Sequence, residues 1–285
     1  MAVALAPGHT LFAMQQSLAL VTGASRGIGS AIARELSRSG VAVVLAARGL
    51  ADCQILAQEL EAEGGRARAI ALDVTDAASI RAALGALEGF ESELGPLSIL
   101  VNNAGTAASQ PLLAKDGASD ELIGRLMAVN FDGARHLAEA LLPGMKTRKF
   151  GRVVNVASSA GLRGYAYVSA YCATKFALVG WTLAAADEFQ SSGVTFNAVC
   201  PHYVDTPMLA RSIDTLVEKT GRTTEQGRAF FAEQNPGGRL VNAEEVARAV
   251  RALCEGNETG LLLELDGGDD ALRHQPNQRK CDWKS

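Results

Sequence analysis

Short apolar runs alternate with helical patterns along most of this chain. We interpret the runs as strands buried on both faces, at residues 17–21, 41–47, 67–74, 97–101, 152–157, 194–199 and 261–265. The stretches between them carry apolar and Ala-rich positions at helical spacing. Strands of this kind, alternating with helices, predict a parallel sheet with right-handed crossovers and helices on both faces. We therefore expect an α/β fold with a doubly wound parallel sheet of about seven strands in one domain.

The first strand leads into a glycine-rich turn. Residues 22–29 read TGASRGIG and are followed by the helical pattern SAIARELSRSG. Gly23, Gly27 and Gly29 suit a turn in which the backbone approaches a phosphate and a helix N-terminus points at its charge. A strand, a glycine turn and an Ala-rich helix in this order predict a Rossmann-type nucleotide-binding domain.

The end of the second strand indicates which dinucleotide is bound. It ends at Ala47-Arg48, without the acidic residue that binds the ribose hydroxyls in many dinucleotide folds. A second arginine, Arg26, lies inside the glycine turn. Guanidinium groups suit a 2′-phosphate, so the two arginines favour NADP(H) over NAD(H). The alternative is that both are ordinary solvated surface residues.

Polar residues follow the next two strands. Asp73-Val74 ends the third, and Asn102-Asn103-Ala104-Gly105 follows the fourth. Asn and Gly form simple turns, but the carboxyl edge of such a sheet is where ligands bind, which favours a cofactor role. Asn130 lies in an apolar helical pattern, where a buried amide must find hydrogen bonds. It is either a satisfied core residue or part of the site.

Tyr171 and Lys175 are candidates for acid–base chemistry. They stand four residues apart in a predicted helix, so both side chains lie on one face. A nearby ammonium favours the phenolate and lowers the pKa of a tyrosine, which makes Tyr171 a candidate general acid or base. Ser158 follows the run 152–157, where a buried strand brings its hydroxyl to the rim of the sheet. Taken alone, Tyr-x-x-x-Lys is more often a surface pair, so the interpretation depends on the other motifs.

Composition limits the classes of partner. The chain has 285 residues, 48% of them hydrophobic and 20% charged, with a net charge of −4, so it can bury a large core and offers no basic field for nucleic acid. No run is long and apolar enough to predict a transmembrane helix, and no basic run suggests a membrane surface. The five cysteines form no C-x-x-C pair, so we expect no metal site, no disulfide framework and a reducing cytoplasm.

Three segments fall outside the regular alternation. Residues 1–16 lack the positive start of a signal peptide and contain Pro7 and Gly8, so we expect a flexible extension. Residues 209–240 form a long polar excursion, which we interpret as a substrate lid. Residues 269–285 are expected to be a mobile tail, which leaves residues 17–268 as the catalytic domain.

With these motifs in order, the chain resembles the compact single-domain branch of the short-chain dehydrogenase/reductase family. The resemblance covers residues 17–268 and rests on TGASRGIG, Asp73-Val74, NNAG, Asn130, Ser158, YCATK, the segment 201–208 and the terminal DGG. It implies that Tyr171 is the catalytic acid/base, that Lys175 lowers its pKa and binds the nicotinamide ribose, and that Ser158 polarises the substrate carbonyl. Asn130 would hold a water that passes protons to Lys175.

The resemblance also implies the cofactor contacts. Asp73 would contact the adenine, Asn102 the adenosine side and Thr206 the carboxamide of the nicotinamide. The full set of implied cofactor residues is Gly23, Ser25, Arg26, Gly27, Ile28, Gly29, Arg48, Asp73, Val74, Asn102, Ala104, Gly105, Tyr171, Lys175, Pro201, Val204 and Thr206. A homo-oligomer, a tetramer or a dimer, is the usual assembly in the family.

The substrate is expected to be a small carbonyl compound or alcohol. The segment 204–246 is similar to that of members acting on 3-oxoacyl or 3-hydroxyacyl thioesters linked to CoA or acyl carrier protein (ACP). The lid carries four cationic residues, Lys219, Arg222, Arg228 and Arg239. They would contact the phosphate of a phosphopantetheine or CoA group. The alternative is that they are solvated loop charges and that Arg239 braces the lid. The alternatives are an NAD-dependent 3-hydroxyacyl-CoA or 3-hydroxybutyrate dehydrogenase, a polyketide or cyclic ketone reductase, and a dinucleotide sensor without turnover.

One position departs from the family pattern. Members commonly carry Pro-Gly where this chain has Pro201-His202, so a side chain stands beside the expected nicotinamide. His202 either fills space, or it touches the substrate or titrates near neutral pH. Cys172, next to Tyr171, is expected to be a small core residue.

Overall fold

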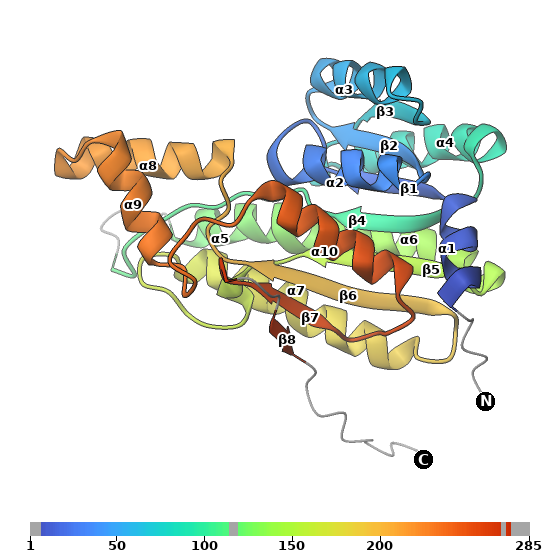
Figure 1. Cartoon of the computed structure of the whole chain (residues 1–285). Coiled ribbons are helices and arrows are strands. Elements are labelled where there is room, and N and C mark those ends of the chain that lie inside the picture. Colours follow the sequence, from blue (N-terminus) through green and yellow to red (C-terminus); the bar gives the residue numbers. More distant parts are fainter. Residues whose placement is uncertain (1–6, 114–118, 269–271, 275–285) are drawn as a thin grey trace, which may run out of the picture.

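An eight-stranded sheet forms the centre of the protein (Figure 1). The computed structural model describes residues 7–113, 119–268 and 272–274. The strand order is β3-β2-β1-β4-β5-β6-β7-β8, and every pairing is parallel except that of β7 with β8. The strands are β1 (Leu18–Thr22), β2 (Ala42–Ala47), β3 (Ala67–Ala71), β4 (Leu97–Asn102), β5 (Gly151–Val156), β6 (Val194–Pro201), β7 (Leu262–Leu265) and β8 (Leu272–His274). The predicted doubly wound parallel sheet is confirmed.

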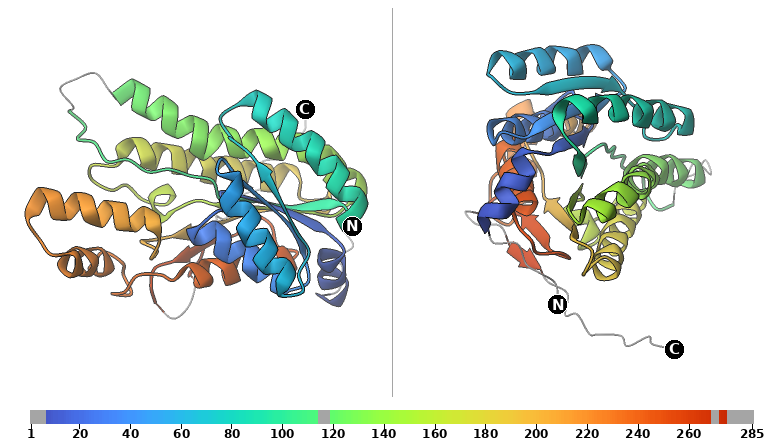
Figure 2. Two further views of the ribbon diagram at one scale, coloured as in Figure 1. Left: turned by 90° about the horizontal axis from the view of Figure 1, so that it is seen from above. Right: turned by 90° about the vertical axis from the view of Figure 1, so that its right-hand side faces the viewer.

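Helices cover both faces of the sheet, as Figure 2 shows. Side chains of α1, α2, α3 and α10 pack with one set of strand residues, and those of α4, α6 and α7 pack with the alternate set. The helices are α1 (Pro7–Gln15), α2 (Gly27–Arg38), α3 (Leu50–Ala62), α4 (Ala77–Leu94), α5 (Ser119–Met127), α6 (Gly133–Arg148), α7 (Ser169–Glu188), α8 (Pro207–Thr220), α9 (Thr224–Glu233) and α10 (Ala243–Glu255). Successive side chains of a strand point to opposite faces, so one apolar strand supplies both layers.

Both ends of the described chain are more ordered than the sequence suggested. Residues 7–15, predicted as flexible, form α1, whose Met14 is fully buried in the core against residues of α2 and α10. The Oγ of Ser17 donates to the carbonyl of Ala13 over 2.8 Å, which joins this helix to β1. Within the predicted tail, β8 pairs with the free edge of β7. The structure therefore places a helix and a strand in these two stretches, and residues 1–6, 269–271 and 275–285 lie outside the described ones.

The strand order reverses beside β1, which has β2 on one side and β4 on the other. In open α/β sheets the crevice at such a point, outside the carboxyl ends of the strands, binds ligands. Beyond this edge stands a pair of helices, α8 and α9, in the segment predicted as a lid (Figure 1). Leu209, Ile213 and Leu240 form its small core. Among the described residues, no helix combines the length and the apolar character needed to cross a membrane.

Candidate active site

The glycine turn is closed by packing that only glycine permits. Gly23 and Gly27 have φ of +64° and +59°, and α2 begins at Gly27. A Cβ on Gly29 would lie 2.3 Å from the carbonyl oxygen of Gly23, and one on Gly23 would lie 2.9 Å from Cα of Ala104. Ile28 packs on the core, while Ser25 lies partly exposed in the turn. The turn therefore places its backbone at the carboxyl edge with the start of α2, as a phosphate-binding turn requires.

Asn103 fixes this turn, a role that the sequence analysis did not assign. Its Nδ2 donates to the carbonyls of Thr22 (2.9 Å) and Gly23 (3.2 Å). The Oγ1 of Thr22 accepts in return from the backbone N–H groups of Asn103 and Ala104, each at 3.0 Å. The motif NNAG signalled a function here, but only the pairing of β1 with β4 shows that it holds the turn.

Asn102 does not reach the cofactor side with its side chain. It is 4% exposed, and its Nδ2 donates to Asn155 Oδ1 at 2.9 Å and to the carbonyl of Ala134 at 3.3 Å. The expected contact with the adenosine side is therefore not supported for this side chain. As the last residue of β4 it points into the layer that α6 covers, because side chains alternate between faces.

Arg26 and Arg48 are both exposed, and neither forms an ion pair with a carboxylate among the described residues. The pKa of the nearby Asp73 is lowered, mainly by hydrogen bonds from the hydroxyl and N–H of Thr75 and to a lesser degree by the charge of Arg48. These local bonds also explain why β3 ends at Ala71 and not at Val74 as predicted, since they replace ladder hydrogen bonds. The two guanidinium groups remain available to a phosphate.

Ser158, Tyr171 and Lys175 come together at the same edge. Tyr171 and Lys175 lie one turn apart on α7, and the Lys175 ammonium is 5.7 Å from the centroid of the tyrosine ring. Its Nζ donates to the carbonyl of Val156 at 3.0 Å. Ser158 caps a short 3₁₀ turn, Ser159–Gly161, and forms a side-chain hydrogen bond with Tyr171. The predicted constellation is thus assembled from the end of β5 and the start of α7.

The electrostatics of this group differ from the expectation. Burial raises the pKa of Tyr171 to about 12, and the hydrogen bond with Ser158 offsets only part of this rise. Burial also lowers the pKa of Lys175 to about 8. Lys175 does not contribute to the shift, so the predicted lowering of the tyrosine pKa by the lysine is not seen. At neutral pH the phenol therefore carries its proton.

Asn130 lies in a π-helical turn, Ala128–Asp132, where the sequence predicted a regular helix. It is 1% exposed, and its Oδ1 accepts from the N–H of Thr106 at 2.8 Å. Its Nδ2 donates to the carbonyl of Thr106 at 2.9 Å and to Thr174 Oγ1 at 3.0 Å. The amide thus joins the segment after β4 to α7. Single π turns inside helices are frequent at functional sites, since they leave backbone groups out of the regular ladder.

The segment after β6 closes the other side of the site. Pro201 ends β6, Val204 forms a bridge with Val241, and the Thr206 side chain caps α8. A Cβ on Gly27 would lie 3.5 Å from Cγ2 of Thr206, so this segment faces the glycine turn. His202 does not simply fill space: its Nε2 lies 2.7 Å from Oε1 of the buried Glu264.

Most of the remaining candidates have structural partners. Cys172 is 6% exposed, as expected of a core residue. Arg228 pairs with Asp205 and Arg239 with Glu245, and the guanidinium of Arg222 lies 5.1 Å from the ring centroid of Phe230. Arg239 also donates to the carbonyl of Gly268, so it braces the base of the lid, which was one of the two interpretations.

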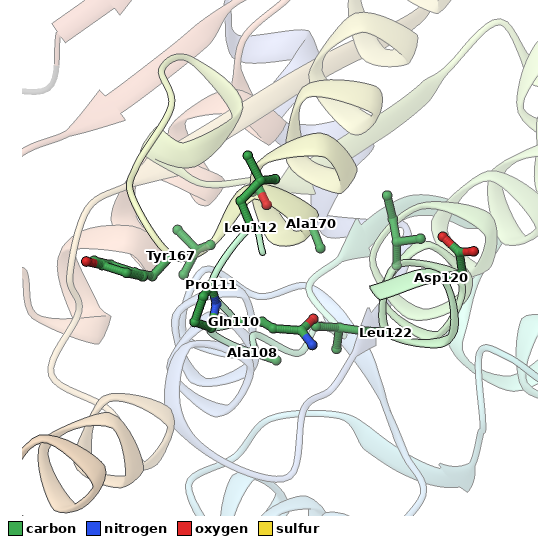
Figure 3. Close-up of a pocket in the computed structure, with 11 residues that line it drawn as sticks. Ala108, Gln110, Pro111, Leu112, Asp120, Leu122, Tyr167 and Ala170 are labelled. Atoms are coloured by element: carbon green, nitrogen blue, oxygen red, sulfur yellow. The ribbon is translucent and has the colours of Figure 1, made fainter. Parts of the chain in front are cut away.

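A pocket of about 230 Å³ lies at the start of α7 (Figure 3). It lies between the segment after β4, the start of α5 and the first residues of α7. Its lining is Ala108, Gln110, Pro111, Leu112, Asp120, Leu122, Ile123, Tyr167, Val168, Ser169 and Ala170. Tyr167 has φ of +65°, and its carbonyl accepts from the N–H of Gln110 at 2.7 Å. Its lining ends at Ala170, directly before Tyr171, and includes none of the four catalytic candidates Asn130, Ser158, Tyr171 and Lys175.

Comparison with known proteins agrees with this geometry. The family model described as short chain dehydrogenase matches residues 17–217. The chain is 34% identical to the 3-oxoacyl-[acyl-carrier-protein] reductase of Haemophilus influenzae, covering 90% of this chain and 98% of the relative. It is 35% identical to the D-beta-hydroxybutyrate dehydrogenase of Cupriavidus necator, covering 88% and 96%. Among solved structures, an actinorhodin polyketide ketoreductase variant with NADPH superposes with a TM-score of 0.81 at 34% identity, covering 89% and 97%.

Proposed function

The chain belongs to the short-chain dehydrogenase family, and on that premise we propose that it is an NADP(H)-dependent ketoreductase. The reaction interconverts a ketone and a secondary alcohol. The observation that carries the proposal is the convergence of Ser158, Tyr171 and Lys175 beside the glycine turn. A protein that only senses a dinucleotide has no use for such a group, so the non-catalytic alternative is disfavoured.

The residues around the site fit a dinucleotide. A Cβ on Gly105 would lie 3.4 Å from Asn130 Oδ1 and 3.8 Å from Lys175 Nζ, so this glycine leaves the space before the lysine open. The nicotinamide supplies the hydride when it is bound. Tyr171 holds a proton at Oη for the carbonyl oxygen, and Ser158 directs a hydroxyl to the same place. Lys175 supplies the positive charge for the cofactor ribose.

We assign the proton relay of Asn130 to its main chain. Its side-chain amide is already engaged with Thr106 and Thr174. A water that serves Lys175 is therefore better held by the main-chain carbonyl within the π turn than by the amide.

The choice of NADP(H) rests on Arg26 and Arg48. Both are exposed beside the glycine turn and the end of β2, and no acidic residue occupies the end of that strand. A 2′-phosphate is bound by such guanidinium groups through charge-assisted hydrogen bonds.

The substrate that we propose is a 3-oxoacyl thioester, carried by ACP or CoA. The relative from Haemophilus influenzae acts on such a thioester by its name, and nearly all of its length is covered. A polyketide ketone is the second candidate, because the ketoreductase structure with NADPH matches equally well in identity. A 3-hydroxybutyrate-type dehydrogenase is the third, supported by the relative from Cupriavidus necator.

The first experiment is a fluorescence titration with NADPH and with NADH, each followed by acetoacetyl-CoA. Tight binding of NADPH and its oxidation on addition of the thioester support both the arginine and the thioester assignments. Binding without oxidation leaves the cofactor assignment and directs the search to polyketide ketones and secondary alcohols. A preference for NADH contradicts the assignment of Arg26 and Arg48.

We further propose that the protein acts as a homo-oligomer in the cytoplasm. Phe176 on α7 and Ile123 on α5 are apolar and exposed, at 45% and 38%, which suits a self-complementary contact. The four described cysteines are buried and unpaired, in keeping with a reducing compartment. Light scattering after gel filtration tests the oligomer, and a monomer at micromolar concentration contradicts it.

A further inference from the structure

A buried carboxylate lies just outside the catalytic group. Glu264 on β7 is 1% exposed, and among the described residues its Oε1 accepts from two side chains. One is the imidazole of His202, whose Nε2 lies 2.7 Å away and whose side chain is 3% exposed. The other is the guanidinium of Arg163, which forms an ion pair with the same oxygen. A carboxylate so deeply buried requires partners of this kind, and arginine is a permanent cation.

The two partners come from opposite sides of the site. Arg163 follows the 3₁₀ turn that Ser158 caps, and its N–H donates to the carbonyl of Ser159. It therefore belongs to the segment 159–168, which leads to Tyr171 and is called here the substrate-side segment. His202 follows the end of β6, and its N–H donates to the carbonyl of Leu265 at 2.9 Å. It belongs to the segment 201–206, which ends at Thr206 and is called here the nicotinamide-side segment.

The bridge also lies close to the floor of the site. Cys200 pairs in register with Glu264 across β6 and β7. Burial raises the pKa of the Cys200 thiol to about 12, while a backbone hydrogen bond from Ser158 and the charge of Lys175 act in the opposite direction. The thiol thus accepts a backbone hydrogen bond from Ser158 and feels the charges of both Lys175 and Glu264.

We propose that Glu264 is a positioning residue that holds these two segments together. This inference rests on the proposed function. By bridging Arg163 and His202, the carboxylate fixes Ser158 and Tyr171 relative to the segment that would contact a bound nicotinamide. The distance and angle of hydride transfer depend on this relation, and a misplacement of 1 Å lowers rates by about a hundredfold in enzymes. The Arg163 side chain is 48% exposed, so this residue can be replaced without leaving a cavity in the core.

The test measures turnover with NADPH that is deuterated at the transferred position, in wild type, Glu264→Gln, Arg163→Gln and the double variant. We expect kcat to fall about tenfold to a hundredfold, with the deuterium isotope effect on kcat increased because hydride transfer becomes slower. The dissociation constant of NADPH should stay within about threefold, since the glycine turn that suits the pyrophosphate and the two arginines that suit the 2′-phosphate lie outside both segments. Because both substitutions break one bridge, the double variant should be no slower than Glu264→Gln. Arg163→Lys, which keeps the charge, should recover part of the activity.

Glu35→Gln is the matched control. It breaks the 2.8 Å ion pair of Glu35 with Arg251, between α2 and α10 and away from the site, and should leave kcat within about twofold. An unchanged kcat and isotope effect in Arg163→Gln would overturn the proposal even if Glu264→Gln does not fold. Effects that multiply in the double variant would overturn it as well.

A failure of the proposed function is recognised separately. If wild type binds NADPH but converts no ketone or alcohol, that function is wrong, and hydrogen exchange then tests the bridge. Glu264→Gln should increase exchange in the segments 159–168 and 201–206 together. Unchanged exchange in either segment overturns the bridge.

Discussion

Replacing Lys175 by methionine should stabilise the protein while it abolishes catalysis. Lys175 is 4% exposed, and burial lowers its pKa from 10.5 to about 8. One pKa unit corresponds to about 1.36 kcal/mol, so holding the ammonium in this site costs about 3 kcal/mol at neutral pH. Methionine is similarly long and uncharged, but it leaves the Val156 carbonyl without its 3.0 Å hydrogen bond, a loss of about 1 kcal/mol. The expected net gain is about 2 kcal/mol, or roughly 4–8 °C in melting temperature.

The gain should depend on pH in a defined direction. Between pH 8 and 10.5 the unfolded lysine binds a proton that the folded one has already released. Stability rises with pH wherever the unfolded state binds more protons than the folded state. The free energy of unfolding of wild type therefore rises relative to that of the variant between pH 8 and 10.5. The advantage of Lys175→Met should therefore be full below pH 8, fall as pH rises from 8, and reverse near pH 10.5, where only the lost hydrogen bond remains.

Denaturant unfolding at several pH values, followed by tryptophan fluorescence, measures this difference. Lys219→Met is the control, because Lys219 is exposed on α8 and its replacement should change stability by less than about 0.5 kcal/mol. If Lys175→Met is less stable than wild type at pH 7, the charged lysine stabilises the folded state, and the reasoning from burial is refuted. A gain that does not change with pH would refute the electrostatic origin.

Three further outcomes are expected. Tyr171→Phe should lower turnover by about a hundredfold to ten-thousandfold while the NADPH dissociation constant, measured by nucleotide fluorescence, stays within about twofold; a variant that keeps most of its activity contradicts the mechanism. Arg26→Ala and Arg48→Ala should each weaken NADPH binding about tenfold or more and leave NADH binding unchanged in the same titration, whereas equal losses would exclude 2′-phosphate recognition. Gly29→Ala puts a Cβ 2.3 Å from the carbonyl oxygen of Gly23. Calorimetry should therefore show weaker binding of both dinucleotides, and melting curves should show that the free energy of unfolding falls by about 1–3 kcal/mol. Unchanged binding would contradict the close packing of the turn as a requirement for the dinucleotide.

Motifs that are local in the sequence were predictable. The spacing of Tyr171 and Lys175 fixes their common face on α7, and TGASRGIG fixes the turn that opens α2. The parallel sheet followed from apolar strands that alternate with helices. What could not be predicted depends on pairs far apart in the chain, such as Asn103 with Thr22, whose contact exists only because β1 and β4 are neighbours.

The errors have a common physical cause. The pKa of Tyr171 was expected to fall because a lysine is near, yet burial raises it to about 12, and only the hydrogen bond with Ser158 acts against this rise. The family resemblance implied that Asn102 contacts the adenosine side of the cofactor, yet its side chain is buried and donates to Asn155. In both cases the residue type and its place in the sequence were informative, but the direction of a side chain and its solvent exposure are set by tertiary packing.

Glu264 shows that a signal for a long-range contact can be present in the sequence. It is the single charge within the run LLLEL at residues 261–265, and an acidic residue in a strand buried on both faces requires a partner. His202, which lies 62 residues earlier and follows β6, departs from the family pattern at the same end of the sheet. Both strands were expected to end at the carboxyl edge of the sheet. The sequence pattern alone can therefore suggest that Glu264 on β7 pairs with His202 after β6. Arg163 lies 101 residues from Glu264 in an irregular segment. The sequence pattern cannot suggest it as a partner, because no periodicity in that segment fixes the direction of its side chain.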